Sequence, residues 1–432
     1  MATSTQTQSP LLPYGVGRFG AGWGVVFLLF LVLLAVGLYG YSRQLIEGEG
    51  VTGLRDVGTM GGAPWGLYIA FELWFVGIGF GAMMLVAAAR LAHIDLLKPL
   101  VRTMCVIALA TLFIGGWSII VDLGQPVRAV VNIIKYARPM SPFFGTFTIG
   151  LVAAFAATLV YLFLDGRRDA AILARRPSRW SWLHRLAASG YTDTEVEKHR
   201  RRRSSALLAG ALLVVAIVAA STSGFVFGIQ QGRPGWFGAL QAPGFVVLAM
   251  LTGTAATVIV AASLRSGLGE KEALGSRVFT LLNTVMLVAS LVYIYFIVVE
   301  IITSSYSSSL ADQRVTDALL TGEYAWMFWL SAALFIVGAA LSIFRATASR
   351  SSIWLVVVAA IAIIIGALLK RYLLVVPPLT TGRLLPYADG SYSPTWVEYA
   401  VVGGLISLGV LFFMIFMKLF PILGLNDREE NV

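Results

Sequence analysis

Charged residues are scarce in this chain of 432 residues: Asp, Glu, Lys and Arg make up 12% of it, whereas hydrophobic residues make up 58%. A soluble domain uses about a quarter of its residues on these four charged types. The shortage of charge, together with a mean hydropathy of +0.82, excludes an ordinary soluble domain. It predicts an integral membrane protein whose apolar surface faces lipid.

Cysteine and histidine are almost absent. Cys105 is the only cysteine, so the chain cannot form an internal disulfide or ligate an iron–sulfur cluster through cysteines. The three histidines, His93, His184 and His199, fall at or beyond the expected cytoplasmic helix ends, whereas a haem in the membrane needs axial histidines within the helices. We therefore expect no haem, iron–sulfur cluster or metal site in this chain, and any such cluster must belong to a partner.

Several enzyme motifs are missing as well. The sequence has no phosphate-binding loop, no His-x-x-His spacing and no nucleophile elbow, which excludes the usual machinery of a membrane ATPase, protease or hydrolase. A net charge of +10 is compatible with nucleic-acid binding, but basic residues in a membrane protein are first explained by its cytoplasmic loops. We expect no nucleic-acid partner.

Long hydrophobic runs are abundant, and a helix needs about 20 mostly apolar residues to cross a bilayer. The residues before Gly20 contain no such run and are predicted to form a disordered tail. The sequence predicts an all-α integral membrane fold of about ten transmembrane helices, at residues 20–42, 66–92, 98–123, 142–165, 205–227, 243–264, 277–302, 324–345, 353–376 and 397–420.

The distribution of lysine and arginine predicts the orientation of these helices. The side that holds both termini carries 22 of the 32 basic residues, and the opposite side carries 10. Because basic residues accumulate on the cytoplasmic side, both termini are predicted to be cytoplasmic in a bacterial inner membrane. The loop at residues 166–204 holds eleven of them, and we expect it to fix the topology and face lipid rather than to bind a partner.

A faint internal repeat divides the chain. Gly66 and Gly244 each follow an Ala-Pro motif at the start of a helix, Asp122 and Glu300 each end a helix, and both pairs are offset by 178 residues. We therefore predict two parallel four-helix bundles, helices 2–5 and 6–9, flanked by helices 1 and 10. The predicted units are a tail (1–19), helix 1 with a periplasmic loop (20–62), the first bundle (63–227), the second bundle (228–376), and a periplasmic loop with helix 10 and a cytoplasmic C-terminus (377–432).

An acidic residue inside a membrane helix is costly, and by default it indicates a functional site. Glu72, in helix 2, is the strongest case. The glycines that follow it, Gly77, Gly79 and Gly81, would let a flat ligand approach the backbone, but close helix packing uses the same small residues. Both interpretations stay open.

Asp122 ends helix 3, just before Gly and Pro residues that break the helix. One interpretation is a helix stop with an ion pair to Arg128 at the membrane surface. The other is a pocket whose floor is the short amphipathic stretch that follows. That stretch carries the polar side chains Asn132, Lys135, Tyr136 and Arg138.

The second bundle holds a weaker version of the same arrangement. Glu300 follows Tyr293 and Tyr295 on one predicted helix. Lys370 and Arg371 stand near the outer end of helix 9. We expect these two long side chains to extend to the membrane surface rather than to act in chemistry.

At four motifs the chain resembles the NrfD/PsrC-like family of polysulfide reductase membrane subunits, in particular its ten-helix branch with HybB, DsrP and ActC/ActF. The resemblance extends from about Pro64 to Glu398. Each motif alone is modest, but together they are specific. The motifs are Pro64-Trp65-Gly66-Leu67-Tyr68; Asp122-Leu123-Gly124-Gln125-Pro126 with Ser141-Pro142; Tyr295-Phe296 through Glu300 to Tyr306 with Gly322-Glu323-Tyr324-Ala325-Trp326-Met327-Phe328-Trp329; and Tyr392-Ser393-Pro394-Thr395-Trp396-Val397-Glu398.

The resemblance implies a membrane anchor of a multi-subunit respiratory oxidoreductase, with no redox cofactor of its own. It implies that menaquinone or ubiquinone binds near the outer face of the first bundle and exchanges electrons with a periplasmic ferredoxin-like iron–sulfur subunit, with proton transfer coupled to the reaction. A further catalytic subunit, whether a molybdopterin enzyme, a hydrogenase or a multihaem cytochrome c, would complete the complex.

The resemblance, read together with the acidic residues, assigns roles to individual side chains. Glu72 and Asp122 are expected to be catalytic as the proton-handling pair. The expected quinone-binding residues are Trp65, Tyr68, Arg128 and Tyr136, and a second-bundle proton path would use Tyr293, Tyr295 and Glu300. Several family members place a histidine beside the quinone, and this sequence has none on that side, so we expect Glu72 to replace it as proton acceptor.

Two other classes stay open. A secondary transporter of a small anion would use Arg128 or Arg371 as its binding group. A purely structural anchor would have no quinone site. Quinone and iron–sulfur subunits that co-purify with the chain would favour the oxidoreductase, whereas uptake by the lone chain in vesicles would favour the transporter.

The charge distribution makes the topology testable. A reporter fused after Ser181 should report a cytoplasmic location, and one fused after Asp317 a periplasmic location, because the basic residues are concentrated on the Ser181 side. The opposite pair of signals would reverse the face assigned to the site.

Overall fold

The computed structural model describes residues 15–57, 63–136, 138, 140–141, 147–176, 178–192, 194–269, 271–306, 309–347, 352–381 and 389–424. These residues form helices and turns without any β-strand. Ten of the helical segments are long and apolar enough to cross a membrane. The predicted fold class, an all-α integral membrane protein with ten spans, is therefore confirmed.

Each predicted span has a counterpart in the structure. The ten are α1 (Ala21–Glu47), α2 (Leu67–Leu91), α3 (Val101–Asp122, preceded by η5, Asp95–Leu100), α5 (Phe147–Ala174), α7 (Glu195–Gly228), α8 (Gln241–Gly267), α9 (Ser276–Tyr306), α11 (Ala325–Thr347), α12 (Ile353–Val375, followed by α13, Pro377–Thr380) and α14 (Trp396–Leu419). Shorter elements connect them: η2 (Glu49–Val51), η3 (Gly53–Asp56), α4 (Pro126–Tyr136), α6 (Ser181–Ala188) and α10 (Leu310–Leu320).

α1 and α9 continue four or five residues past their predicted ends, to Glu47 and Tyr306, and two other helices extend further beyond their predicted apolar runs. α5 continues to Ala174, and α7 begins at Glu195, ten residues before the predicted start at residue 205. The side-chain oxygen of Thr194 accepts a hydrogen bond from the backbone N–H of Glu197 and so caps α7. The basic run that precedes the membrane therefore belongs to a helix and not to a loop.

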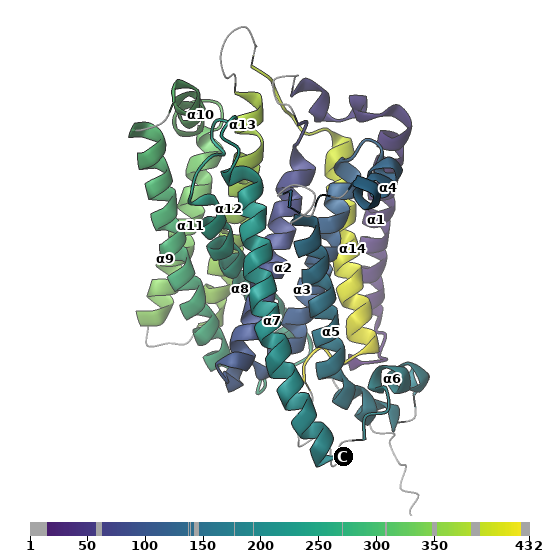
Figure 1. Cartoon of the computed structure of the whole chain (residues 1–432). Coiled ribbons are helices and arrows are strands. Elements are labelled where there is room, and N and C mark those ends of the chain that lie inside the picture. Colours follow the sequence, from purple (N-terminus) through teal and green to yellow (C-terminus); the bar gives the residue numbers. More distant parts are fainter. Residues whose placement is uncertain are drawn as a thin grey trace, which may run out of the picture.

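α2 lies in the middle of the molecule (Figure 1) and is the most enclosed of the ten spans formed by the described residues. It packs against α3, α7, α8 and α12. This position explains why α2 is apolar around nearly its whole circumference. It also makes α2 the junction between the two halves of the chain.

Helices 2–5 of the prediction correspond to α2, α3, α5 and α7, and helices 6–9 to α8, α9, α11 and α12. Neighbouring helices within each set pack on one another, as the prediction of two four-helix units requires. The flanking helices α1 and α14 pack together, and α14 packs on α3. Both therefore flank the first unit, and they lie on the same side of the molecule (Figure 1).

Glycines permit the closest helix contacts. A Cβ atom at Gly81 of α2 would overlap the carbonyl oxygen of Ala249, and one at Gly253 of α8 would overlap the backbone of Gly81. Gly37 of α1 and Gly404 of α14 meet in the same way. Helices in lipid associate through such small residues, since lipid tails offer an equally apolar environment to larger ones.

The bundle has two distinct ends. α4 and α10 lie at one end, called here the α4–α10 end, and α6 lies at the other (Figure 1). Gly17, in the segment predicted as a disordered tail, donates a backbone hydrogen bond of 3.0 Å to the carbonyl oxygen of Lys418. The segment at residues 15–19 therefore packs beside the end of α14, while residues 1–14 lie outside the described part. The start of α1 and the end of α14 thus lie at the same end of the bundle.

The α2–α8 contact makes a stability prediction. Gly81→Ala should lower the thermal midpoint of the detergent-purified protein, because the added Cβ overlaps the α8 backbone and overpacking costs about 1–3 kcal/mol or more. Gly210→Ala on α7 is the matched control, since a Cβ there meets nothing within 4 Å. Equal midpoints for the two variants would contradict the contact.

Candidate functional site

Glu72 lies on α2 in the interior of the protein. Its side chain is 2% exposed, and its Oε1 atom has no hydrogen-bond partner among the described residues. α3 packs against this part of α2, where a Cβ at Gly115 would come within 3.6 Å of the Glu72 carbonyl oxygen. A buried carboxylate that lacks donors is costly unless it binds a ligand or a proton.

Asp122 is the last residue of α3, and its Oδ1 atom is also buried without a hydrogen-bond partner among the described residues. The charged groups that act on it are other carboxylates, those of Glu49, Glu398 and Glu72. Asp122 forms no ion pair with Arg128 in the described part of the structure, and Arg128 is exposed. The site thus has two acidic groups with unused oxygens on neighbouring helices. The interpretation of Asp122 as a helix stop with an ion pair to Arg128 is not supported.

A buried hydrogen-bond network lies beside Asp122. The Tyr68 hydroxyl donates to Gln44 Oε1 at 2.8 Å, and Gln44 Nε2 donates to Glu49 Oε1 and to the carbonyl oxygen of Val121, each at 3.0 Å. Burial raises the pKa of Glu49, and the negative charge of Glu398 adds to the increase, whereas hydrogen bonds from Gln44 and Thr52 oppose it. The network connects the interior to Glu49, which is only partly buried.

Glu398 is the best-satisfied acid of the region. It is fully buried and accepts hydrogen bonds from the backbone N–H groups of Gly53 (2.7 Å) and Thr395 (2.9 Å) and from the Tyr392 hydroxyl (2.5 Å). The Tyr392 hydroxyl in turn accepts a hydrogen bond of 2.7 Å from the N–H of Leu67, the first residue of α2. This network therefore fixes the start of α2, five residues before Glu72.

Sequence reasoning did not single out Gln44 or Glu49, and it named Tyr392 and Glu398 only as the two ends of a family motif, without a role. The available signal was the spacing of Thr395 and Glu398, which form a capping box at the start of α14. That pattern indicates a helix start and does not reveal that the Glu398 carboxylate also binds the loop at Gly53. Long-range contacts of this kind are not encoded in local spacing.

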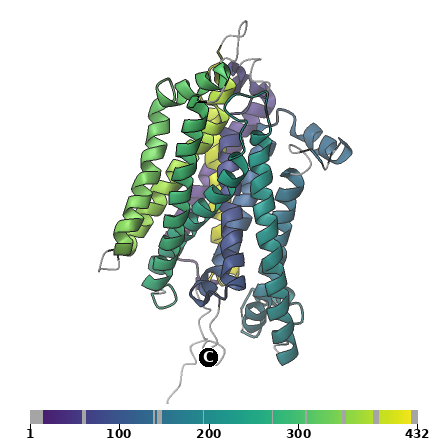
Figure 2. The same ribbon diagram turned by 60° about the vertical axis from the view of Figure 1, so that its left-hand side comes forward.

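The four predicted quinone-binding residues do not all meet. Trp65 packs against Trp236, with ring centroids 5.8 Å apart, and against Phe227. Tyr68 is fully buried in the network described above. Arg128 lies on α4, which projects from the bundle (Figure 2), and the side chain of Tyr136 lies outside the described part of the structure.

The residues predicted to form a proton path in the second bundle also differ in their positions. Tyr293 is buried, whereas Tyr295 is 64% exposed and points away from the interior. Lys370 Nζ lies 2.8 Å from Glu300 Oε2 in an ion pair. Lys370 and Arg371 are therefore turned inward, and the prediction that they extend to the membrane surface was wrong.

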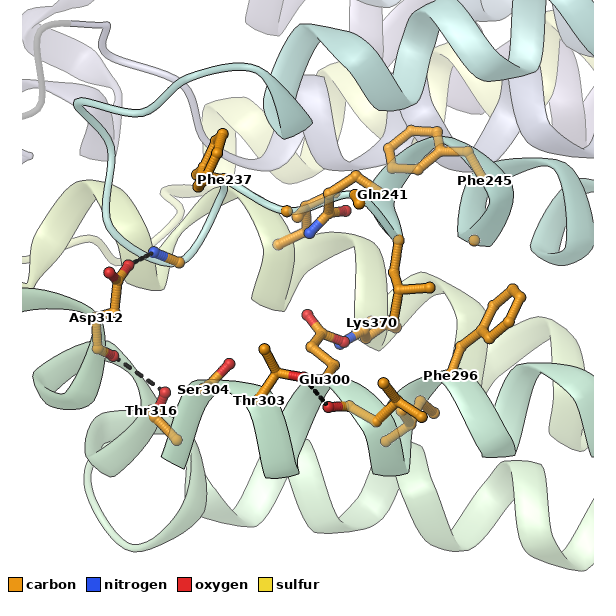
Figure 3. Close-up of a pocket in the computed structure, with 18 of the residues that line it drawn as sticks. Phe237, Gln241, Phe245, Phe296, Glu300, Thr303, Ser304, Asp312, Thr316 and Lys370 are labelled. Atoms are coloured by element: carbon orange, nitrogen blue, oxygen red, sulfur yellow. Dashed lines mark hydrogen bonds and ion pairs between the residues drawn. The ribbon is translucent and has the colours of Figure 1, made fainter. Parts of the chain in front are cut away.

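These inward-facing residues line a cavity of about 660 Å³ between the start of α8, α9 and α12. Figure 3 shows Phe237, Gln241 and Phe245 on one side of it and Phe296 and Glu300 on the other. Its polar lining is completed by Thr303, Ser304, Ser309, Asp312, Thr316, Lys370 and Arg371. The cavity combines aromatic walls with paired charges, a composition typical of ligand pockets.

No cluster of three or more His, Cys, Asp or Glu side chains in the described part of the chain has the arrangement of a metal site. The chemistry available from the described side chains is proton transfer and hydrogen bonding. Both unpartnered acids, Glu72 and Asp122, are suited to accept a proton from a bound molecule.

Comparison with known proteins gives a consistent result. A family model described as "Polysulphide reductase, NrfD" matches residues 56–381. A protein of Halobacterium salinarum, named as a putative membrane subunit of dimethyl sulfoxide reductase, is 28% identical, with 97% of this chain and 95% of the relative covered. A selenate reductase subunit of Mesobacillus selenatarsenatis is 21% identical, with 94% and 95% covered.

A third relative is the integral membrane subunit of a menaquinone reductase from Nitratidesulfovibrio vulgaris. It is 24% identical, with 98% of this chain and 97% of the relative covered. The three relatives match along nearly their whole length, so the similarity includes all ten spans and not one bundle alone.

The Glu398 network makes a testable prediction. Tyr392→Phe should lower stability by about 1–3 kcal/mol, because it leaves the buried N–H of Leu67 without its acceptor and removes one donor from Glu398. Thermal unfolding in detergent measures the effect. Tyr399→Phe is the control, since the Tyr399 side chain is 60% exposed, and an equal loss in both variants would contradict the role given to the network.

Proposed function

The chain belongs to the NrfD family of polysulphide reductase subunits, and from this membership we propose that it is the quinone-linked membrane subunit of a multi-subunit oxidoreductase. Its relatives carry the names of dimethyl sulfoxide, selenate and menaquinone reductase subunits. The observation that carries the proposal is a pair of acids on α2 and α3, Glu72 and Asp122, each with a buried oxygen that no described residue hydrogen-bonds.

Quinol oxidation releases two electrons and two protons, and quinone reduction takes up the same number. The electrons pass to or from an iron–sulfur partner, so the membrane subunit must handle the protons within a medium that excludes water. A carboxylate within hydrogen-bond reach of a quinol hydroxyl is the group that this chemistry requires. Glu72 supplies the carboxylate, and its free Oε1 atom leaves an acceptor for the hydroxyl.

Asp122 and Glu49 extend this role toward the α4–α10 end. Asp122 interacts electrostatically with both Glu72 and Glu49, and Glu49 is partly exposed. We infer that protons from the quinol pass from Glu72 through Asp122 to Glu49 and leave at that end. Glu398, which already accepts three hydrogen bonds, positions α2 and does not exchange protons.

We infer that the α4–α10 end faces the periplasm and docks an iron–sulfur subunit, while both termini stay cytoplasmic in the inner membrane. α4 presents an apolar residue, Val127, that is 78% exposed, and it carries Arg128 of the proposed quinone-binding set. Trp65, Tyr68 and Tyr136 complete that set. Menaquinone is the quinone we favour, because it appears in the name of one relative.

The role of Glu72 is tested by Glu72→Gln in the intact complex. Gln keeps the volume of Glu but cannot accept a proton, so quinol turnover should fall by roughly 10²- to 10⁴-fold while the complex still assembles. Turnover of a short-tailed quinol measures the effect, and size-exclusion chromatography checks assembly. Near-normal turnover in an assembled complex would remove Glu72 from the mechanism.

Asp122→Asn tests the second acid. Because Asp122 is proposed to relay protons, the variant should lower kcat more than it raises the KM for quinol. A rise in KM with little change in kcat would contradict the relay and indicate that Asp122 holds the quinone head group. Glu47→Gln is the matched control, because Glu47 is an exposed acid near the same end and is paired only with Arg43 among the described residues. The control should behave like the unaltered complex.

A further inference from the structure

We propose that the cavity between α8, α9 and α12 is a second binding site for the head group of a membrane quinone. This inference rests on the proposed function and adds a site to the one proposed near Trp65 and Tyr68. The cavity belongs to the second four-helix unit. At about 660 Å³, it falls within the range of pockets that hold small organic ligands.

The walls suit a flat aromatic head group. Phe237 approaches the cavity from the segment before α8 and Phe245 from the first turns of α8, and Phe296 faces them from α9 (Figure 3). Aromatic rings pack favourably against one another in offset or edge-to-face geometry. A phospholipid head group has no ring that would use these walls.

The charges in the lining favour a neutral ligand. Lys370 and Arg371 are positive and Glu300 and Asp312 are negative, so the four formal charges cancel. Lys370 is paired with Glu300, and Asp312 accepts a hydrogen bond of 2.9 Å from the backbone N–H of Gly235. A phosphate or another anion would need an excess of positive charge, whereas a quinone or quinol needs only separate donors and acceptors.

Arg371 has unused hydrogen-bonding capacity at the cavity wall. It is 4% exposed, and no hydrogen bond or ion pair joins its guanidinium to any residue that the structure describes. The guanidinium carbon lies 3.7 Å from the centroid of the Phe245 ring, which fixes its position at the cavity wall. A buried guanidinium carries five N–H donors, and a quinone carbonyl is an acceptor that can enter this space.

Arg371 also connects the cavity to Glu72. Its Nη2 atom is 3.9 Å from the position of a Cβ on Gly77 of α2, and the Arg371 and Glu72 charges act on each other. A head group bound at Arg371 would therefore lie on the side of α2 that faces the second unit. The Glu72 carboxylate would then interact with groups of both four-helix units.

Photolabelling of the intact complex tests the assignment. A short-tailed azido-naphthoquinone should label peptides from α8 and α9, around Phe245 and Phe296, and unlabelled menaquinone should suppress the labelling. Gly244→Trp should reduce it about tenfold, because Gly244 lines the cavity and a Cβ there meets nothing within 4 Å, so the indole fills the space. Gly267→Trp, at the opposite end of α8 and equally open, is the control and should label normally.

A second variant tests the polar contact. Arg371→Gln should raise the concentration of quinone that half-suppresses labelling by about tenfold, since a hydrogen bond to a charged group is lost. Arg314→Gln removes the same charge from an exposed position on α10, outside the cavity, and should have no effect. Because Gly244→Trp keeps Arg371, the two variants test the site independently of any folding defect in one of them.

The outcomes separate this inference from the proposed function. Labelling confined to peptides of α2 and α4 would overturn the second site and leave the proposed function intact. Absence of quinone-protected labelling anywhere in an active preparation would count against both. Suppression by added phospholipid, and not by menaquinone, would identify a lipid site and overturn the assignment.

Discussion

The close contact between α2 and α8 is the constraint on which the rest of the arrangement depends. At Gly81 and Gly253 the two backbones approach so closely that a side chain on either would overlap the other. Helices in a membrane gain little from leaving lipid for another apolar surface, so backbone packing of this kind has to hold the two units together. The contact also brings α12 beside α2. Arg371 and Glu72, which belong to different units, consequently act on each other.

The acids of the bundle fall into two groups according to their partners. Asp169 is paired with Arg102 at 2.7 Å, Glu300 is paired with Lys370, and Glu398 accepts three hydrogen bonds. Glu72 and Asp122 each keep an oxygen without a partner among the described residues. A paired acid holds its neighbours in place, and protonation of its carboxylate would break its ion pair or hydrogen bonds. An acid without donors can change its protonation state at no such cost, which is why function is assigned to this second group.

The ten spans were predictable because a helix that crosses a bilayer needs an apolar run of a certain length. The helical turns outside the apolar run are not subject to this requirement. The start of α7 was misplaced for that reason, since its first turns carry charge and depend on the Thr194 cap. Glu72 was identifiable as a charge within an apolar run. The inward position of Arg371 was not, because the sequence near a helix end does not reveal which neighbour the side chain faces. Tyr392 and Glu398 were assigned no role because Leu67 and Gly53, whose N–H groups they bind, lie more than 300 residues away in the sequence.

The internal repeat shows how two similar units come to differ in chemistry. Asp122 and Glu300 are offset by 178 residues, but Asp122 ends α3, whereas α9 continues to Tyr306, so the prediction that Glu300 ends its helix was wrong. Asp122 has an oxygen that no described residue contacts, whereas Glu300 is held by Lys370 at 2.8 Å. The difference arises from a single basic residue on α12, which neutralises the acid of the second unit. Lys370 is engaged in this ion pair, whereas the buried guanidinium of Arg371 has no hydrogen bond or ion pair to a described residue. The first unit therefore retains acids that can exchange protons, and the second retains a donor that can orient a ligand beside them.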